Sequence, residues 1–208
     1  LFEHIRDIPY SFSVRMTDRT TAPEQILTVG RGYCGPKHYL LAEMYRKLGL
    51  EVVYDTFPFY WNDPDLRYPP GLRILAAAVP IAYHLACRVL INGRWVLVDA
   101  TWDPALRQGG FPINESWDGL SETRCAVKPL HSSDRTANCG TVTNDLRSDS
   151  GTRKRNAPDG EQNHRNEAGR TRYRFQGTGI RAPEDMDKIL RFYPAFEAWL
   201  ESLRNKQE

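Results

Sequence analysis

Cysteine is scarce in this chain, and its few copies are widely spaced. The 208 residues include four, Cys34, Cys87, Cys125 and Cys139, and no two of them form a CxxC pair. Zinc sites and disulfide-rich scaffolds usually need closely spaced cysteines, so we expect neither, and no metal. Dispersed cysteines are more typical of a reducing compartment, which predicts a cytoplasmic protein. The chain starts at Leu1 rather than Met, and we therefore expect a trimmed N-terminus.

The chain also lacks long apolar runs and a strong net charge. Its longest apolar run, residues 74–81, is interrupted by Pro80 and is far shorter than the roughly 20 residues that cross a bilayer. The 28 Lys and Arg nearly balance the 26 Asp and Glu, which leaves a formal net charge of +2. Such a balance is not the footprint of a nucleic-acid-binding protein. We expect neither a membrane nor a nucleic-acid partner, and the absence of nucleotide and flavin motifs predicts no cofactor.

Aromatic residues are missing from one long internal segment. Residues 131–172 contain none, and few of their other side chains are apolar. Such a composition cannot offset the conformational entropy that is lost on ordering. We therefore predict a catalytic core at 1–130, a disordered polar insertion at 131–172, and a C-terminal strand and helix at 173–208 that pack on the core.

Helical periodicity is clearest just after the first cysteine. The apolar residues that share this spacing are Leu41, Met44, Tyr45 and Leu48. Pro36 suits the first turn of such a helix and Gly49 suits its C-terminal cap. Cys34 is therefore predicted to lie at the N-terminus of a helix.

Weaker signals outline the remaining elements. We predict short helices at 1–8 and 23–29, a strand at 51–57 and a proline-rich loop at 58–71. Acidic residues after Pro183 mark the start of a further helix, which Pro194 is expected to kink or split.

A β-hairpin is the most clearly predicted unit in the sequence. Two apolar, β-prone runs, 83–91 and 94–101, are joined by Asn92-Gly93, the strongest short-range hairpin signal. An early helix followed by an antiparallel sheet predicts an α+β fold, with that helix packed on the sheet.

The two-residue turn also sets the register of the hairpin. It pairs Ile91 with Arg94, and counting back along both strands makes His84 and Asp99 diagonal neighbours on one face. A hydrogen bond between the histidine and the carboxylate is therefore possible. Cys87 points to the opposite face and is excluded as a partner of this histidine.

These placements combine into a candidate nucleophile site. A helix N-terminus and a nearby imidazolium both favour the thiolate of Cys34, and Asp99 would orient and charge His84. Three glycines, Gly30, Gly32 and Gly35, leave room for a substrate carbonyl beside the backbone N–H of the cysteine. His38 is expected to be an ordinary polar helix residue.

Four segments carry a resemblance to a known family: 6–10, 30–38, 83–84 and 93–104. Together they resemble the transglutaminase-like branch of the papain-like cysteine enzymes, over about residues 1 to 105. The order Cys, His, Asp, with spacings of 84−34=50 and 99−84=15, is that family's pattern. The resemblance implies a papain-like core with Cys34 as nucleophile, His84 as base and Asp99 as orienter. For a side-chain oxyanion donor, which varies within the family, the sequence offers Tyr10 or Trp61.

The chemistry expected of such a site is acyl transfer at an amide or ester bond through a thioester. Resolution by water would make a cysteine protease or amidase, a hydrolase. Resolution by an amine would make a transglutaminase-type acyltransferase, and arylamine acetyl transfer is a related variant. The expected partner is a peptide, a protein or a small amide substrate. A non-catalytic peptide-binding or scaffolding module on the same fold is the alternative, and a structural domain with incidental Cys, His and Asp is a third reading.

Overall fold

A computed structural model of the chain describes residues 1–130 and 183–205. The predicted insertion at 131–172 lies outside the described residues. In chain order the elements are α1 (Phe2–Arg6), α2 (Ala22–Val29), α3 (Cys34–Lys47), β1 (Val52–Phe59), α4 (Pro70–Ala78), β2 (Ala82–Ile91), β3 (Arg94–Val98), the 3-10 helix η1 (Pro104–Gly109) and α5 (Pro183–Arg204).

The three strands form one antiparallel sheet in the order β1-β2-β3. Asn92 and Gly93 both have positive φ, at 49° and 74°, as the tight turn between β2 and β3 requires. Ile91 pairs with Arg94, so the predicted hairpin register is confirmed.

The second strand of the hairpin is shorter than predicted. β3 ends at Val98 rather than at residue 101, so the expected backbone pairing beyond that point was wrong. The backbone N–H of Asp99 instead donates to Oγ1 of Thr123, at 2.8 Å. The chain therefore leaves the sheet just where the candidate carboxylate lies.

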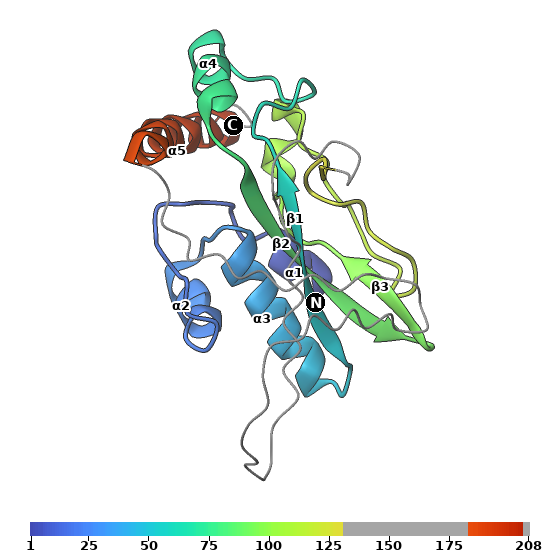
Figure 1. Cartoon of the computed structure of the whole chain (residues 1–208). Coiled ribbons are helices and arrows are strands. Elements are labelled where there is room, and N and C mark those ends of the chain that lie inside the picture. Colours follow the sequence, from blue (N-terminus) through green and yellow to red (C-terminus); the bar gives the residue numbers. More distant parts are fainter. Residues whose placement is uncertain (131–182, 206–208) are drawn as a thin grey trace, which may run out of the picture.

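Helix α3 packs against β2, and α2 lies beside α3 (Figure 1). The predicted end of α2 at Gly30 is confirmed, because this glycine adopts the left-handed conformation with φ 72°. A helix packed on an antiparallel sheet confirms the predicted α+β class.

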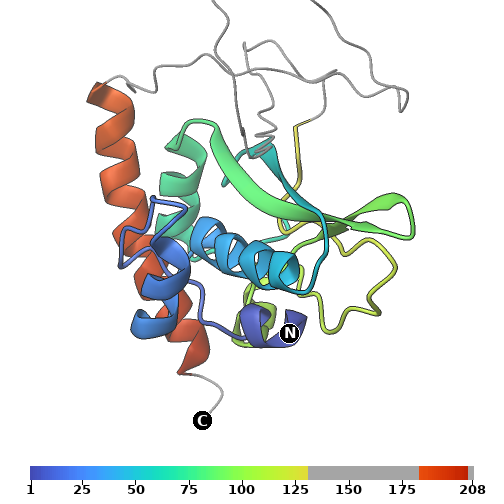
Figure 2. The same cartoon turned by 90° about the horizontal axis from the view of Figure 1, so that it is seen from below.

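The buried apolar side chains form two hydrophobic clusters. One lies between the sheet and helices α1, α2 and α3, with Leu41, Val89 and Val98 fully buried. The other gathers aromatic side chains around α4, η1 and α5, including Trp102 and Phe196. Figure 2 shows α5 running along the side of the molecule away from the hairpin. The candidate site lies where the two clusters meet.

The expected loop at 58–71 was wrong, and so was the expected splitting of the last helix at Pro194, whereas a kink there stays a prediction. The segment 58–71 is not one loop, because β1 continues to Phe59 and α4 begins at Pro70. Helix α5 is neither split nor ended by Pro194. Pro194 deprives only the carbonyl of Leu190 of its helical partner, and Leu190 is 66% exposed, so water can replace that hydrogen bond.

Polar contacts anchor α5 to the segment before α2. Glu197 accepts hydrogen bonds from the hydroxyl of Ser11 and, at 2.9 Å, from the backbone N–H of Phe12. Nη2 of Arg204 donates to the carbonyl of Tyr10 and to the carboxylate of Asp103, both at 2.8 Å. The C-terminal helix is thus fixed to residues that border the candidate site.

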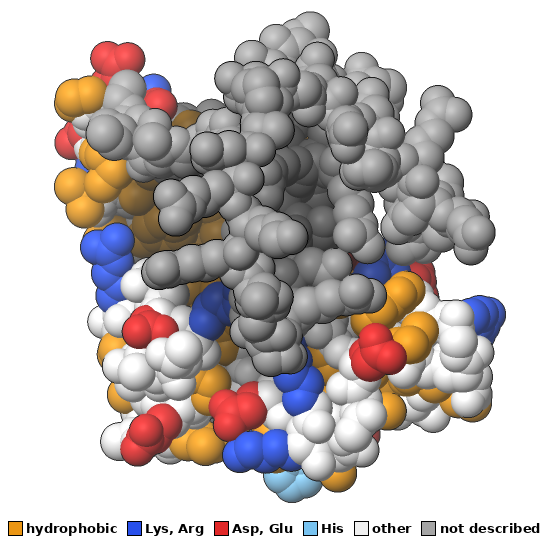
Figure 3. All heavy atoms as spheres, turned by 60° about the horizontal axis from the view of Figure 1, so that its bottom comes forward, with side chains coloured by type: hydrophobic (Ala, Val, Ile, Leu, Met, Phe, Trp, Pro, Cys, Tyr) orange, Lys and Arg blue, Asp and Glu red, His pale blue; other side chains and the backbone are white. Residues whose placement is uncertain are grey.

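The face drawn in Figure 3 has no large patch of described side chains of one charge. On the face drawn in Figure 3, the acidic and basic side chains of the described residues are interspersed. Within the described part of the chain, no helix is both long and apolar enough to cross a membrane.

A buried ammonium group joins three segments beneath the site. Nζ of Lys37, on α3, donates to the backbone carbonyls of Arg6 and Ile8 at 2.8 Å and of Thr101 at 2.7 Å. The side chain is inaccessible to solvent, and this burial lowers the pKa of Lys37, against the opposing charges of Asp103 and Asp99. Three carbonyl acceptors match the three donors of an ammonium group. Lys37 therefore holds the N-terminal segment and the chain after β3 on α3.

Replacement of this lysine tests its structural role. We expect Lys37→Met to lower the free energy of unfolding by roughly 3 kcal/mol, because three buried carbonyls lose their donor. Lys47→Met, on the exposed end of the same helix, should change it by less than about 0.5 kcal/mol. Urea unfolding followed by circular dichroism measures both values. Equal stabilities of the two variants would contradict the role assigned to Lys37.

Candidate active site

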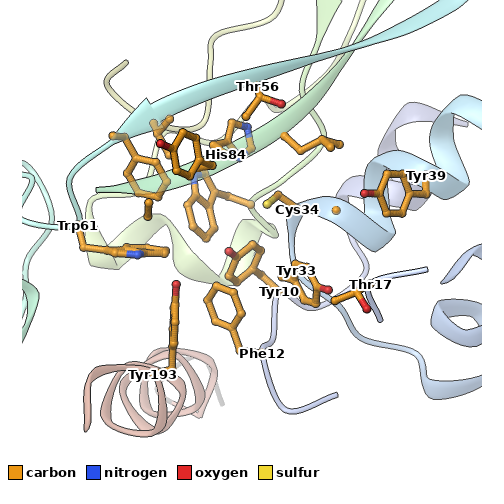
Figure 4. A pocket seen from close by; sticks show the side chains of 17 residues that line it. Tyr10, Phe12, Thr17, Tyr33, Cys34, Tyr39, Thr56, Trp61, His84 and Tyr193 are labelled. Atoms are coloured by element: carbon orange, nitrogen blue, oxygen red, sulfur yellow. The ribbon is translucent and has the colours of Figure 1, made fainter. Parts of the chain in front are cut away.

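Cys34 is the first residue of α3, as the sequence predicted. Tyr33 precedes it in an extended conformation, with its hydroxyl donating to the carbonyl of Met16 at 2.7 Å. Gly32 packs closely here, because a Cβ at this position would lie 2.7 Å from the end of the Ile26 side chain, which would have to shift. The backbone on both sides of the cysteine is therefore closely held, and its side chain points into a cavity (Figure 4).

His84, on β2, is hydrogen-bonded to Asp99. Its Nε2 lies 2.8 Å from Oδ2 of Asp99, and the two residues are only 2% and 1% exposed. The structure thus brings together two residues that the hairpin register placed as neighbours, although β3 ends before Asp99. Because Nε2 is engaged, Nδ1 is the ring nitrogen that remains for a reacting group.

Asp99 accepts hydrogen bonds from three further donors. Its Oδ1 accepts from the backbone N–H and hydroxyl of Thr101, at 3.2 and 2.6 Å. Its Oδ2 also accepts from the backbone N–H of Ala126, at 2.7 Å. Burial alone would raise the pKa of Asp99, but the charge and hydrogen bond of His84, with help from His38 and Thr101, lower it well below its usual range. The carboxylate is charged at neutral pH.

The electrostatics of His84 follow from this partner. Burial lowers its pKa, whereas the charge of Asp99 and the hydrogen bonds to Asp99 and Cys34 raise it, with a net rise to about 10. His84 is therefore an imidazolium at neutral pH. It both contacts the candidate nucleophile and carries the positive charge that favours a thiolate.

His38 was wrongly expected to be an ordinary polar helix residue. It is completely buried, and its Nε2 accepts a hydrogen bond from the backbone N–H of Ala100 at 3.1 Å. Nδ1 must then carry the proton, and it donates to the carbonyl of Cys34 at 2.8 Å. Burial lowers the pKa of His38 to about 4 despite the nearby Asp99. A neutral histidine thus links the cysteine to the chain after β3.

The remaining cysteines differ in their surroundings. Sγ of Cys87 donates to the carbonyl of His38 at 3.2 Å, and Cys87 does not line the cavity. Cys125, which the sequence gave no reason to single out, groups with His84 and Asp99, with one ligand atom of each within 4.8 Å of the others. Cys139 lies outside the described residues.

The cluster of Cys125, His84 and Asp99 could in principle hold a metal ion, since each residue offers a ligand atom. The geometry favours a hydrogen-bond network instead. Both carboxylate oxygens of Asp99 already accept bonds from N–H or O–H donors, and Nε2 of His84 is one of these donors. Burial and the charge of Asp99 raise the pKa of Cys125 to about 12.

The cavity in front of Cys34 has a volume of about 440 Å³. Both candidates for the oxyanion donor, Tyr10 and Trp61, line it together with Cys34 and His84. In Figure 4 Tyr10 lies near Cys34, whereas Trp61 is set apart from the sulfur. The structure therefore favours Tyr10 over Trp61 by position.

Comparison with known proteins gives little further guidance. No protein-family model matches the chain, and no curated protein matches it in sequence. Among solved structures, a candidate cysteine protease from Cytophaga hutchinsonii aligns with a TM-score of 0.36 and 17% identity, over 72% of this chain and 45% of that one. The aligned part of this chain thus spans less than half of that protein. At this TM-score the similarity carries no argument, so function rests on the site itself.

The two buried histidines are expected to differ in charge at pH 7. Nitrogen-15 NMR of the imidazole rings should show His84 as an imidazolium and His38 as a neutral ring with its proton on Nδ1. In Asp99→Asn the pKa of His84 should fall below 7, since its negative partner is gone.

The raised pKa of His84 also makes the stability of the protein depend on pH. The contribution that the raised pKa of His84 makes to stability is fully present below the ordinary pKa of 6.5 and is lost as the pH rises through about 10. A neutral His84 in the wild-type protein at pH 7 would contradict this assignment.

Proposed function

We propose that the protein is a cysteine-nucleophile enzyme that transfers acyl groups from amides or esters through a thioester. One observation carries this proposal: Cys34, at the start of α3, shares a cavity with His84, whose Nε2 is held by the buried Asp99. Nδ1 of His84 is then left for the thiol and the substrate. Neighbouring nucleophile, acid-base group and orienting carboxylate are the parts that this chemistry needs.

The reaction would proceed in balanced steps. The thiolate of Cys34 attacks the carbonyl carbon, a C–S bond forms, and the carbonyl electron pair moves onto oxygen. His84 gives its Nδ1 proton to the departing amine as the C–N bond breaks, which leaves a thioester. Water or a second amine then attacks the thioester, its proton passes to His84, and the C–S bond breaks to restore the thiolate.

The developing oxyanion needs donors near the sulfur. The backbone N–H of Cys34 is one candidate, because it lies at the start of α3. The hydroxyl of Tyr10, which lies near Cys34 in Figure 4, is the second. Trp61 is the weaker alternative, because it lies farther from the sulfur.

Cys34 is a better nucleophile candidate than Cys125. Cys34 is half-buried and opens to the cavity, where a substrate can reach it. Cys125 also lies near His84, but its thiol stays protonated at neutral pH because its pKa is raised to about 12. An inert thiol beside the catalytic pair is consistent with a structural role.

The finer assignment follows the sequence. We propose a transglutaminase-type core at residues 1–130, with the insertion at 131–172 and a packing element at 173–208. The proposed substrate is a peptide, a protein or a small amide, and no cofactor takes part in the steps above. The identity of the group that resolves the thioester, water or an amine, decides between a hydrolase and a transferase.

Mass spectrometry after incubation with a mixed library of peptides and primary amines tests the reaction. Cleaved peptides would identify a protease, and peptide–amine conjugates would identify a transferase. Cys34→Ala should abolish all products, whereas Cys125→Ala should retain them. Binding of library members by the wild-type protein without any turnover would favour the non-catalytic binding module instead.

Alkylation near pH 6 tests the activated thiol. We expect iodoacetamide to modify Cys34 faster than Cys87, Cys125 or Cys139, because the charged His84 favours the thiolate. In Asp99→Asn the pH profile of Cys34 alkylation should move to higher pH, and turnover should fall by about two to four orders of magnitude. Peptide mapping by mass spectrometry measures each site.

The outcome that would remove Asp99 from the site is an unchanged pH profile of Cys34 alkylation in Asp99→Asn. A lowered melting temperature without such a shift would mean that the carboxylate only organises the backbone around Thr101 and Ala126.

A further inference from the structure

The cavity beside Cys34 is lined by an unusual set of side chains. Most carry aromatic rings, and among the described residues that line it there is no Asp, Glu, Lys or Arg. Among the described residues that line the cavity, His84 is the one whose side chain is cationic at neutral pH, and it lies beside Cys34. Beyond the reacting atoms, the cavity offers apolar ring surface and hydroxyl groups.

Three of these rings form a continuous wall, which we call the aromatic wall: Phe12, Tyr33 and Tyr193. Phe12 stacks on Tyr33 at 5.5 Å between ring centroids and contacts Tyr193 at 4.3 Å. Tyr33 directly precedes Cys34, whereas Tyr193 comes from α5. Figure 4 shows the wall below the sulfur, with Phe12 between the other two rings.

All three rings of the aromatic wall are only partly buried. Aromatic rings usually bury most of their area in a core, so partly exposed rings inside a concave pocket leave apolar surface for a ligand. The cavity volume of about 440 Å³ lies in the range of small-molecule sites.

One charged residue, Glu197, is hydrogen-bonded to the backbone of the wall. Glu197 accepts hydrogen bonds from Ser11 and from the backbone N–H of Phe12, and it does not line the cavity. At the aromatic wall, away from His84, a charged group of a substrate would lose water without gaining a charged partner among the lining residues, which is unfavourable. An uncharged ring would lose little and could stack on Phe12.

The direction of the Cys34 side chain says which part of a substrate fills the cavity. Its sulfur points into this space, so a group that stays bonded to the sulfur lies in the cavity that the wall lines. In acyl transfer that group is the acyl part, which stays on the cysteine as the thioester.

We propose that the aromatic wall selects acyl groups that carry an uncharged aromatic ring next to the carbonyl under attack. This inference rests on the proposed function, because it takes Cys34 as the atom that receives the acyl group. The substrates are then amides or esters of neutral aromatic acids, or peptides with an aromatic residue on the acyl side of the reacting bond.

Two measurements on the full chain test the aromatic wall. The first is ligand-observed NMR on Cys34→Ala, which cannot react, with phenylacetamide, its para-carboxylate and acetamide. We expect phenylacetamide to bind at least about tenfold more tightly than either of the other two amides, because only it carries a neutral ring on the acyl side of the carbonyl. Equal affinity for all three amides would overturn the inference.

The second measurement uses covalent probes on the wild-type protein. We expect N-benzylchloroacetamide to label Cys34 at least about tenfold faster than chloroacetamide, after correction for their reactivity with free cysteine. The para-carboxylate of the benzyl probe should lose this advantage. Equal corrected rates for all three probes would also overturn the inference.

Variants connect the preference to the wall. Phe12→Ala should remove the preference for the benzyl compounds in both measurements, and Phe12→Leu, which keeps more of the packing, should weaken it. Tyr60→Ala serves as the matched control, because Tyr60 is an exposed aromatic residue outside the cavity and its loss should leave the preference unchanged. A preference that survives both Phe12 variants would exclude the wall as its source.

The two measurements also separate this inference from the proposed function. Selective binding of phenylacetamide without preferential labelling of Cys34 or turnover would support the wall and refute the acyl-transfer enzyme. Rapid labelling of Cys34 with turnover but without preference for a ring would refute the wall alone.

Discussion

Asp99 places a full negative charge in the interior, and much of the structure around the site serves to hold it there. A buried carboxylate is strongly unfavourable unless donors replace the water that it loses. Those donors come from β2, through His84, and from two stretches of irregular chain, at Thr101 and Ala126. One charge therefore helps to fix the position of three segments, together with hydrogen bonds such as that from Nε1 of Trp102 to the carbonyl of Ala126.

The residues that follow Asp99 are also held on α3, through His38 and through Lys37. His38 links the carbonyl of Cys34 to the backbone N–H of Ala100, and Lys37 binds the carbonyl of Thr101. Hydrogen bonds thus join the first turn of α3 to Ala100 and Thr101, the two residues that follow Asp99. The distance between nucleophile and carboxylate is set by this backbone network as well as by the packing of the helix on the sheet.

Local sequence signals were sufficient for the parts of the fold that depend on neighbouring residues. Asn92-Gly93 determines the hairpin turn and, with it, the register that brings His84 near Asp99. Helical spacing after Cys34 and the left-handed Gly30 likewise have local causes. For this reason the candidate triad could be named from the sequence, while its chemical role remains a proposal.

Other features of the site depend on partners that are distant in sequence, and no local sequence pattern predicts them. The role of His38 requires a backbone N–H from the chain after β3, and the burial of Lys37 requires carbonyls from two separate segments. Cys125 comes near His84 only through the path of the chain after η1. Helix α4 had a usable signal, since prolines suit a first turn and Leu72 and Ala76 recur at helical spacing, but its prolines favoured a loop instead.

Helix α5 lines one side of the cavity with Tyr193. Because α5 lies at the C-terminal end of the described residues, the order of synthesis has a consequence for folding. Cys34, His84 and Asp99 are all translated long before Tyr193 and Phe196. Until α5 has left the ribosome, the rings that it covers, among them Trp61 and Tyr68, have no partner on that side. A nascent chain at this stage would expose an apolar aromatic surface beside Cys34, His84 and Asp99, and chaperones that recognise such surfaces would be its expected first contacts.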